Sequence, residues 1–300
     1  MSGVSCFWRS LLFVPAHVEK FIDRAHERGA DACILDLEDS VPLAQKSMAR
    51  QALPAAAAKL QARGLDVLAR INSLQGGGLD DLEVISSPSL CAVVLPKVGS
   101  AEDVRVVAAV LERLELERGL AKGGIGLLAQ IEDVAALPRL DEIASASPRL
   151  LGMSLGPEDF CVSASMEALP ETLFGPSQQV AFACRRAGIL PFGYPDSIAL
   201  FTDLPRLRHS VLLARQLGMV GAFCIHPAQV AVLNELFSPA SEDVEYAEGL
   251  LVELANARAE GRGAFAYRGR MVDPPVVARA LELLERHRAS LRRLAALDHH

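Results

Sequence analysis

Short apolar runs alternate with longer segments of helical periodicity along most of this chain, and this alternation limits the possible folds more than any other feature. Eight such runs occur, each bounded by Gly, Pro, Asp or Asn. They are residues 10–15, 32–37, 67–71, 92–96, 125–131, 150–155, 190–194 and 222–225. The alternation is typical of βαβ units and a parallel sheet. Eight units within about 230 residues predict an α/β fold of the (β/α)₈ TIM-barrel type, for which about 250 residues is usual.

An open, doubly wound sheet is the rival architecture for the same alternation. Such a sheet usually has a glycine-rich phosphate-binding turn after its first strand. Here the first run ends in the sequence PAH at 15–17, without glycine. The three glycines at 76–78 follow the third run but lack the spacing of a dinucleotide or phosphate loop, so we expect a flexible loop there. The barrel is therefore favoured.

The chain continues beyond the eighth unit with segments that have helical periodicity. They are residues 241–260 and 274–297, separated by an expected loop at 261–271. Pro274 and Pro275 suit the start of a helix. No internal repeat and no Ser/Pro linker separates a second domain. We predict a catalytic barrel domain at 1–240 and a C-terminal helical extension at 241–300 that belongs to the same structural unit.

Charge and cysteine usage narrow the possible partners and location. A formal net charge of −7 gives no general attraction for nucleic acid or anionic membranes. No apolar run approaches the roughly 20 residues of a membrane span, and the apolar stretch at 11–14 is too short for a signal peptide. The six cysteines are dispersed without a CxxC pair, as expected of buried thiols in a reducing compartment. We expect a cytoplasmic protein with no nucleic-acid or membrane partner.

Ionisable residues concentrate directly after the predicted strands, where the active site of a barrel lies. Seven of the eight strand ends carry a charged residue or a histidine. The set comprises Asp36, Glu38, Asp39, Arg70, Lys97, Glu132, Asp133, Glu158, Asp159, Asp196 and His226. Single aspartates in it, such as Asp39, Asp133 and Asp159, would also serve as helix N-caps. Convergence of the whole set on one face of a barrel is better explained by an active site.

The residue types at these strand ends indicate the chemistry. Acidic oxygens without a His or Cys cluster favour Mg²⁺, which is usually held by one or two carboxylates with waters and substrate oxygens. Arg70 could clamp a substrate carboxylate or carbonyl, or pair with a neighbouring acid such as Glu38. Lys97 could form a Schiff base, but the surrounding acids would keep it cationic and oppose that chemistry. His226 is expected to cap its strand end in preference to acting as a base.

Together these strand-end sequences resemble the citrate lyase beta subunit branch of the HpcH/HpaI aldolase and citrate lyase family. The resemblance covers nearly the whole chain, and its motifs are specific in their order and spacing. They are RSLLFVP at 9–15, ILDLEDSV at 34–41, Lys46 with Arg50, RIN at 70–72, LPK at 95–97, QIE at 130–132, SLGPED at 154–159, CIHPAQ at 224–229 and MVD at 271–273.

The resemblance implies a Mg²⁺-dependent barrel, usually a trimer or a hexamer, that cleaves or forms 3-hydroxyacyl-CoA thioesters. The expected reaction is a retro-Claisen cleavage of a citramalyl-, malyl- or citryl-CoA-like thioester to acetyl-CoA and a 2-oxo acid. Glu132 and Asp159 would hold the metal, and Arg70 would contact the substrate carbonyl.

The remaining site residues also follow from the resemblance. Those that would order Arg70 and water at the metal are Asp36, Glu38 and Asp39. Those that would complete the substrate-binding set are Lys46, Arg50, Lys97, Glu132 and His226. Asp273 would act in the active site of a neighbouring subunit, whereas its local sequence also suits a cap for the helix that begins at Pro274.

Two departures from the family pattern bear on the substrate. Relatives often have Gly-Lys before the Ile-His-Pro run, whereas Ala222 occupies the Lys position here. The seventh strand of relatives often ends in Asp-Thr or Asp-Gly, whereas this chain has Tyr194 and Pro195 in the sequence GYPD. Both could alter the pocket for the acyl group or CoA. Two alternatives stay open: a CoA-independent aldolase of 2-keto-3-deoxy acids, and a lyase subunit that needs an acyl-carrier partner.

Overall fold

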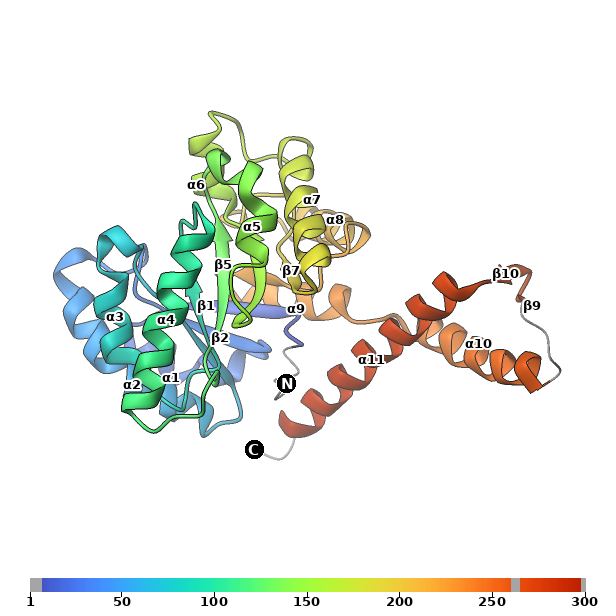
Figure 1. Ribbon diagram of the computed structural model, residues 1–300, viewed down its shortest axis with the longest axis horizontal. Coiled ribbons are helices and arrows are strands. Elements are labelled where there is room, and N and C mark those ends of the chain that lie inside the picture. Colours follow the sequence, from blue (N-terminus) through green and yellow to red (C-terminus); the bar gives the residue numbers. More distant parts are fainter. Residues whose placement is uncertain (1–6, 260–264, 298–300) are drawn as a thin grey trace. The chain divides into compact units, whose positions relative to one another are not determined.

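The computed structural model of the protein describes residues 7–259 and 265–297 (Figure 1). The chain divides into two compact units. The larger unit is Trp8–Phe237, and the smaller contains the described residues from Ser238 onward together with Phe7.

Eight parallel strands form the centre of the larger unit. They are β1 (Ser10–Pro15), β2 (Ala32–Asp36), β3 (Asp66–Arg70), β4 (Ala92–Leu95), β5 (Gly126–Ile131), β6 (Leu150–Leu155), β7 (Leu190–Phe192) and β8 (Ala222–Cys224). Their order in the sheet is β7-β6-β5-β4-β3-β2-β1-β8. A parallel bridge from Phe192 to Gly221 joins the two outer strands. The sheet therefore closes, and the predicted (β/α)₈ barrel is confirmed.

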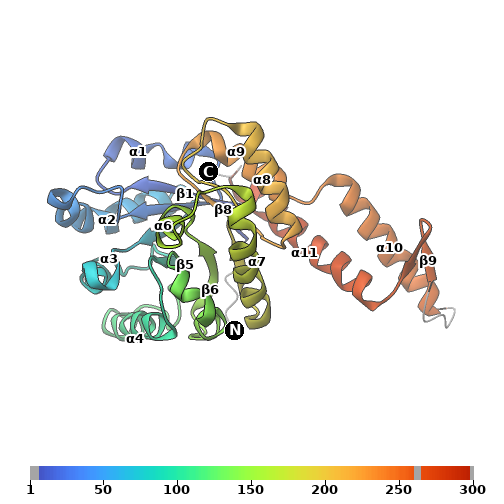
Figure 2. The same cartoon turned by 90° about the horizontal axis from the view of Figure 1, so that it is seen from above.

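Helices surround the strands, as Figure 2 shows from above. The α-helices are α1 (Glu19–Asp23), α2 (Lys46–Gln61), α3 (Gly78–Ile85), α4 (Ala101–Glu117), α5 (Leu140–Ala144), α6 (Pro157–Ser163), α7 (Pro170–Ala187), α8 (Leu204–Gln216) and α9 (Pro227–Phe237). Short 3₁₀ turns are η1 (Ala25–Arg28), η2 (Leu43–Gln45), η3 (Leu74–Gly76) and η4 (Val134–Arg139). The flexible loop expected at 76–78 was wrong, because Gly78 begins α3. A Cβ at this position would lie 2.3 Å from the carbonyl oxygen of Asn72.

Successive side chains of each strand point alternately towards the surrounding helices and towards the interior of the barrel, so the core has two parts. In β1, Leu12 and Val14 belong to the apolar layer between the sheet and the helices. Phe13 lies on the opposite face, which is the interior of the barrel. Its ring is 5.6 Å from that of Phe223, which continues the aromatic contacts to Phe192 at 6.3 Å. The interior below the strand ends is therefore filled by aromatic rings.

The smaller unit is a pair of helices joined by a β-hairpin. It contains α10 (Ser241–Ala259), β9 (Phe265–Tyr267), β10 (Arg270–Val272) and α11 (Pro274–Leu297). Only a loop was predicted at 261–271, and this prediction was wrong for residues 265–267 and 270–272, which are strands. Arg268 and Gly269 both have positive φ, 44° and 77°, as a tight two-residue hairpin turn requires. Phe265 and Val272 on the two strands pack into the same apolar cluster as Leu250 and Leu284 of the helices.

No helix in the described part of the chain has the length and apolar character needed to cross a membrane.

Candidate active site

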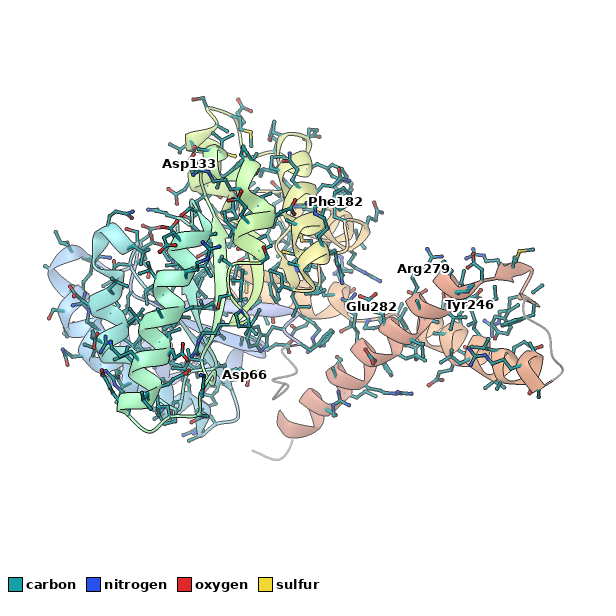
Figure 3. All side chains as sticks on the ribbon, viewed as in Figure 1. Asp66, Asp133, Phe182, Tyr246, Arg279 and Glu282 are labelled. Atoms are coloured by element: carbon teal, nitrogen blue, oxygen red, sulfur yellow. The ribbon has the colours of Figure 1, made fainter. Side chains whose placement is uncertain are left out.

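A pocket of about 400 Å³ lies at the carboxyl ends of the barrel strands. Figure 3 labels Asp133, directly after Glu132, at the end of the barrel opposite Asp66, the first residue of β3. The polar residues that line the pocket are Asp36, Asp39, Ser40, Arg70, Gln130, Glu132, Glu158, Asp159 and Asp196. Most of the acids predicted from the strand ends therefore meet in one cavity.

Arg70 is held by the acids that end the neighbouring strand. Asp36 and Arg70 stand opposite each other in the register of β2 and β3. Arg70 donates from Nε to Asp36 Oδ1 at 2.6 Å and from Nη2 to Oδ2 at 2.8 Å. Its Nη1 lies 3.1 Å from Glu38 Oε2 and 3.8 Å from Asp39 Oδ2. The guanidinium also lies over the ring of Phe13, 4.6 Å from the centroid.

The pKa values of this cluster reflect the pairing. Burial raises the pKa of Asp36, but the hydrogen bonds and charge of Arg70, together with the hydrogen bonds from Ser40 and the backbone of Glu38, lower it by more, so the carboxylate stays ionised. Burial also raises the pKa of Glu38; Arg70 opposes the rise, and Asp39 adds to it. Neither oxygen of Glu38 has a partner in hydrogen-bond geometry, although both are buried. The Arg70 guanidinium is thus fully paired with Asp36 and only loosely paired with Glu38.

Glu132, directly after β5, has an uncompensated carboxylate. Its Oε2 is buried and accepts no hydrogen bond. Burial raises the pKa of Glu132 to about 8, and the nearby Glu38 and Asp159 add to the rise. Gly156 lies so close that a Cβ there would be 2.5 Å from Glu132 Cγ. Asp159 is exposed in the first turn of α6.

A divalent cation fits this arrangement. A buried carboxylate oxygen without a partner, next to a second carboxylate, gains most from a positive charge. The described residues contain no group of three or more His, Cys, Asp or Glu arranged around one point, so a zinc-type cage is not formed by them. Two carboxylates with open space for water and substrate oxygens suit Mg²⁺. Glu132 and Asp159 are therefore the residues that could hold it.

Lys97 follows β4 with a φ of 54°, a rare value for a residue with a side chain. Its Nζ is 3.4 Å from Glu38 Oε1. Burial lowers the pKa of Lys97, but Glu38, Asp39 and Asp159 raise it by more. The cation is thereby stabilised, which opposes Schiff-base chemistry.

Lys46 and Arg50 on α2 have their partners within the chain. Lys46 Nζ donates to the carbonyl oxygens of Leu37 and Glu38, both at 2.8 Å, and to Asn72 Oδ1 at 2.5 Å. Arg50 Nε donates to Asp81 at 2.6 Å. The other oxygen of that carboxylate accepts from the backbone and side chain of Asn72. Both cations thus fix the loops that carry Glu38 and Asn72, and their direct contact with substrate stays a prediction.

His226 lies exposed where β8 turns into α9. Its ring stacks on Phe201 with centroids 4.7 Å apart, and its Nδ1 accepts from the backbone N–H of Ala228 at 3.1 Å. The imidazole therefore caps the turn into the helix, which is the structural role expected for it.

Asp273 belongs to the smaller unit, between β10 and α11. Its Oδ1 accepts from the backbone N–H of Val276 at 3.1 Å, so it caps α11 as its local sequence predicted. Its expected part in the active site of a neighbour stays a prediction.

Several residues in or next to the pocket had no role predicted from the sequence. Gln130 lines the pocket, and its Oε1 is buried without a hydrogen-bond partner. The same holds for Oγ of Ser154, which lies behind the lining, opposite Gln130 in the register of β5 and β6. The period of two along β5 could have indicated Gln130, because it shares a face with Glu132. The apolar lining was also missed, including Phe13, Tyr194 and Phe223, since apolar residues in a strand predict core.

A closed barrel with an acid-rich pocket at the carboxyl ends of its strands defines an enzyme of the (β/α)₈ class. More particularly, the chain belongs to the HpcH/HpaI aldolase/citrate lyase family, whose family model matches residues 9–227.

Individual relatives are similar over nearly their whole length. Citrate lyase subunit beta of Escherichia coli (strain K12) is 35% identical over 283 residues, which cover 93% of this chain and 92% of that protein. L-malyl-CoA/beta-methylmalyl-CoA lyase of Rhodobacter capsulatus is 35% identical over 291 residues, covering 88% and 90%. A crystal structure of CitE from Mycobacterium tuberculosis, in complex with magnesium, acetoacetate and coenzyme A, superimposes with a TM-score of 0.70 at 29% identity over 93% of this chain and 97% of that one.

Proposed function

We propose that this chain is a Mg²⁺-dependent carbon–carbon lyase that cleaves a 3-hydroxyacyl-CoA thioester to acetyl-CoA and a 2-oxo acid. The observation that carries the proposal is the buried, unpartnered carboxylate of Glu132 beside Asp159, within one pocket that also contains Arg70. The names of the relatives support it, because one is a malyl-CoA lyase and another binds magnesium and coenzyme A.

Glu132 and Asp159 would hold the cation. When bound, Mg²⁺ would supply Lewis-acid polarisation of the carboxylate and hydroxyl oxygens of the substrate. Ser40 and Gln130 line the same pocket and would bind water or substrate oxygens there.

Arg70 would stabilise the charge that develops during bond cleavage. In a retro-Claisen reaction the hydroxyl proton passes to water in the open pocket, the hydroxyl oxygen becomes the carbonyl oxygen of the 2-oxo acid as the carbon–carbon bond breaks, and the electron pair of that bond moves towards the thioester carbonyl oxygen. Arg70 Nη1 is the guanidinium nitrogen not committed to Asp36, so it can donate to that oxygen. A single donor of this kind is worth about 3–4 kcal/mol. Asp36, Glu38 and Asp39 would orient the guanidinium.

The enolate carbon of acetyl-CoA must then receive a proton. We assign this step to Asp273 of a neighbouring subunit. This assignment requires an oligomer, and we propose a homotrimer or hexamer. We also propose that the protein is cytoplasmic. We place Lys46 and Arg50 as positioning residues behind the loop of Glu38 and Asn72. Lys97 and His226 would contact the substrate or its CoA portion at the rim.

The test is a chromatographic assay of the pure chain with Mg²⁺, offered malyl-, citramalyl- and citryl-CoA separately. We expect acetyl-CoA that disappears when EDTA is added. The Glu132→Ala variant should lose this turnover. Its matched control is Asp133→Ala, which alters the adjacent exposed carboxylate that caps η4 and accepts from Ser163 Oγ at 2.8 Å. Turnover that persists in EDTA would refute the metal assignment.

Failure with all three thioesters would favour one of the alternatives. Activity on free 2-keto-3-deoxy acids would indicate a CoA-independent aldolase. Activity restored by an acyl-carrier protein would indicate a subunit that works on a carrier thioester, as the name of the E. coli relative allows.

A further inference from the structure

The two residues proposed to hold the cation differ in how firmly the chain fixes them. Glu132 is buried directly after β5, whereas Asp159 is exposed in the first turn of α6. This helix has only seven residues, and its N-cap residue, Gly156, has no side chain that could accept a hydrogen bond from the first turn. A capping side chain would not fit at this position, because even a Cβ would lie 2.5 Å from Glu132 Cγ. The start of α6 must therefore be held in another way.

Glu158, the residue directly before Asp159, makes the contact that holds it. Ser197 Oγ donates to Glu158 Oε1 at 2.6 Å, and the backbone N–H of Ala199 donates to the same oxygen at 3.4 Å. The N–H of Ala199 also donates to Ser197 Oγ at 3.2 Å. Both partners of Glu158 belong to the segment between β7 and α8, and β7 pairs with β6, which leads into α6. The bond between Ser197 and Glu158 thus joins the segments that follow two neighbouring strands.

The segment that contains Ser197 is itself fixed to the barrel on both sides of this residue. The carboxylate of Asp196 is 2% exposed and accepts from Arg206 Nε at 2.9 Å and from Arg206 Nη2 at 2.6 Å. It also accepts from the backbone N–H of Ser197 at 2.8 Å. On the other side, the carbonyl oxygen of Ile198 accepts from Nε2 of the fully buried Gln229 at 3.1 Å. Ser197 therefore offers Glu158 a firm point of attachment.

The two joined segments both contribute to the active-site pocket. Glu158 and Asp159 line it from α6, and Asp196 and Ile198 line it from the segment after β7. The affinity of a metal site depends on the groups that orient its ligands, since a ligand held in place loses less freedom when the cation binds. An exposed carboxylate on a short helix gains more from such support than a buried one.

We infer that Glu158 is a positioning residue, whose hydrogen bond from Ser197 fixes the first turn of α6 and thereby the carboxylate of Asp159. The same bond couples the cation to the pocket-lining segment between β7 and α8. Mg²⁺ at Asp159 therefore orders this segment, and by reciprocity an ordered segment strengthens Mg²⁺ binding. The inference rests on the proposed function, because it takes Asp159 as a holder of Mg²⁺.

The test is calorimetric titration of the metal-free chain with Mg²⁺. Ser197→Ala should weaken binding about tenfold, the size typical when a metal ligand loses a supporting partner. Ser197→Thr keeps the hydroxyl group and should restore the affinity. Thr202→Ala is the matched control, because Thr202 is exposed in the same segment, outside the described residues that line the pocket. Equal affinity of Ser197→Ala and the wild type would overturn the inference and leave the proposed function intact, whereas a wild type that binds no Mg²⁺ would refute the metal assignment of the proposed function itself.

A second variant separates a positioning role for Glu158 from direct metal binding. Glu158→Ala should weaken Mg²⁺ binding to a similar extent, and addition of Ser197→Ala should then have little further effect, because both changes break one bond. A loss in Glu158→Ala that Ser197→Ala does not share would make Glu158 a metal ligand and overturn its positioning role.

Hydrogen exchange tests the coupling without any measurement of activity. Mg²⁺ should slow the exchange of backbone amides in residues 197–203 of the wild type, and this protection should be largely lost in Ser197→Ala. A change that affected only folding would leave the response to Mg²⁺ unaltered. Equal protection by Mg²⁺ in the two proteins would overturn the coupling.

Discussion

Replacement of Glu132 by Gln should stabilise the metal-free protein at neutral pH while it removes the response to Mg²⁺. The folded protein raises the pKa of Glu132 from 4.5 to about 8, chiefly because the carboxylate is buried. Between these two pH values the folded state keeps a proton that the unfolded state has released. The stability of the wild type therefore falls as pH rises through this window, and Gln, which carries no charge, avoids the loss.

The size of the effect follows from the two pKa values. Proton linkage gives a loss of about 3–4 kcal/mol for the wild type between pH 5 and pH 8. Part of it is recovered by relaxation of the neighbouring Glu38 and Asp159, so we expect the variant to gain roughly 2–3 kcal/mol over this range relative to the wild type. Mg²⁺ narrows the difference, because a cation at ten times its dissociation constant adds about 1.4 kcal/mol to the wild type alone, and about 2.7 kcal/mol at one hundred times that constant cancels it.

Urea unfolding in EDTA at several pH values measures this difference. Trp8 is the single tryptophan of the chain and is buried in the barrel unit, so its fluorescence reports that unit. Glu142→Gln, on an exposed residue of α5, is the matched control and should follow the wild type at every pH. A stability difference between Glu132→Gln and the wild type that stays constant from pH 5 to pH 8 would refute the burial argument.

Three further perturbations test other parts of the site. Arg70→Met leaves Asp36 buried without its partner and should destabilise the barrel by about 3–5 kcal/mol, whereas combination with Asp36→Leu should recover most of the loss in urea unfolding. Gly156→Ala forces Glu132 aside and should weaken Mg²⁺ binding about tenfold in a thermal-shift titration; unchanged affinity would argue against Glu132 as a ligand. Asp273→Asn keeps a good helix cap but removes the acid, so turnover should fall while the Mg²⁺ affinity stays the same, and unchanged turnover would leave Asp273 only its cap.

The fold was predictable because its signal repeats along the chain. Every predicted strand is present, and most boundaries shift by only one or two residues, as at Leu37 and Ile71, which the structure leaves just outside β2 and β3. The hairpin of the smaller unit could not be predicted in this way. Its strands have three residues each, too few for a period of two to be recognised, and part of the segment, 260–264, lies outside the described residues.

The acids of the site were predictable because topology alone brings strand ends together. The hydrogen-bond partners of these acids could not be predicted, because they depend on distances and burial in the folded protein. The sequence suggested an ion pair of Arg70 with a neighbouring acid such as Glu38, and that pair is present at 3.1 Å. It did not indicate that Asp36 makes both short hydrogen bonds, which follows from its place opposite Arg70 in the register. Lys46 likewise resembled a substrate ligand by motif, whereas its three donors are all used by oxygen atoms of the chain.

The two ends of the barrel differ in how their buried charges are satisfied, and the difference indicates where function lies. Before β1 and β2, Arg9 donates two hydrogen bonds from its guanidinium to Asp31, at 2.8 and 2.7 Å. Before β5 and β6, Glu115 accepts from Arg149 and from two backbone N–H groups, so its pKa is lowered despite burial. At the carboxyl ends, by contrast, Glu132 and Glu38 are buried with oxygens that accept no hydrogen bond, and their pKa values are raised, although Glu38 lies within ion-pair distance of Arg70 and Lys97.

The pairing of Asp31 and Glu115 shows that this fold can provide hydrogen-bond partners for buried acids. The missing partners of Glu132 are therefore not a consequence of the fold. Unpartnered carboxylates cost stability, and they persist where a ligand supplies the missing charge. The positive φ of Lys97 adds backbone strain at the same end. The energetic cost is thus concentrated around one pocket, which is the pattern expected if a cation and an anionic substrate complete the site.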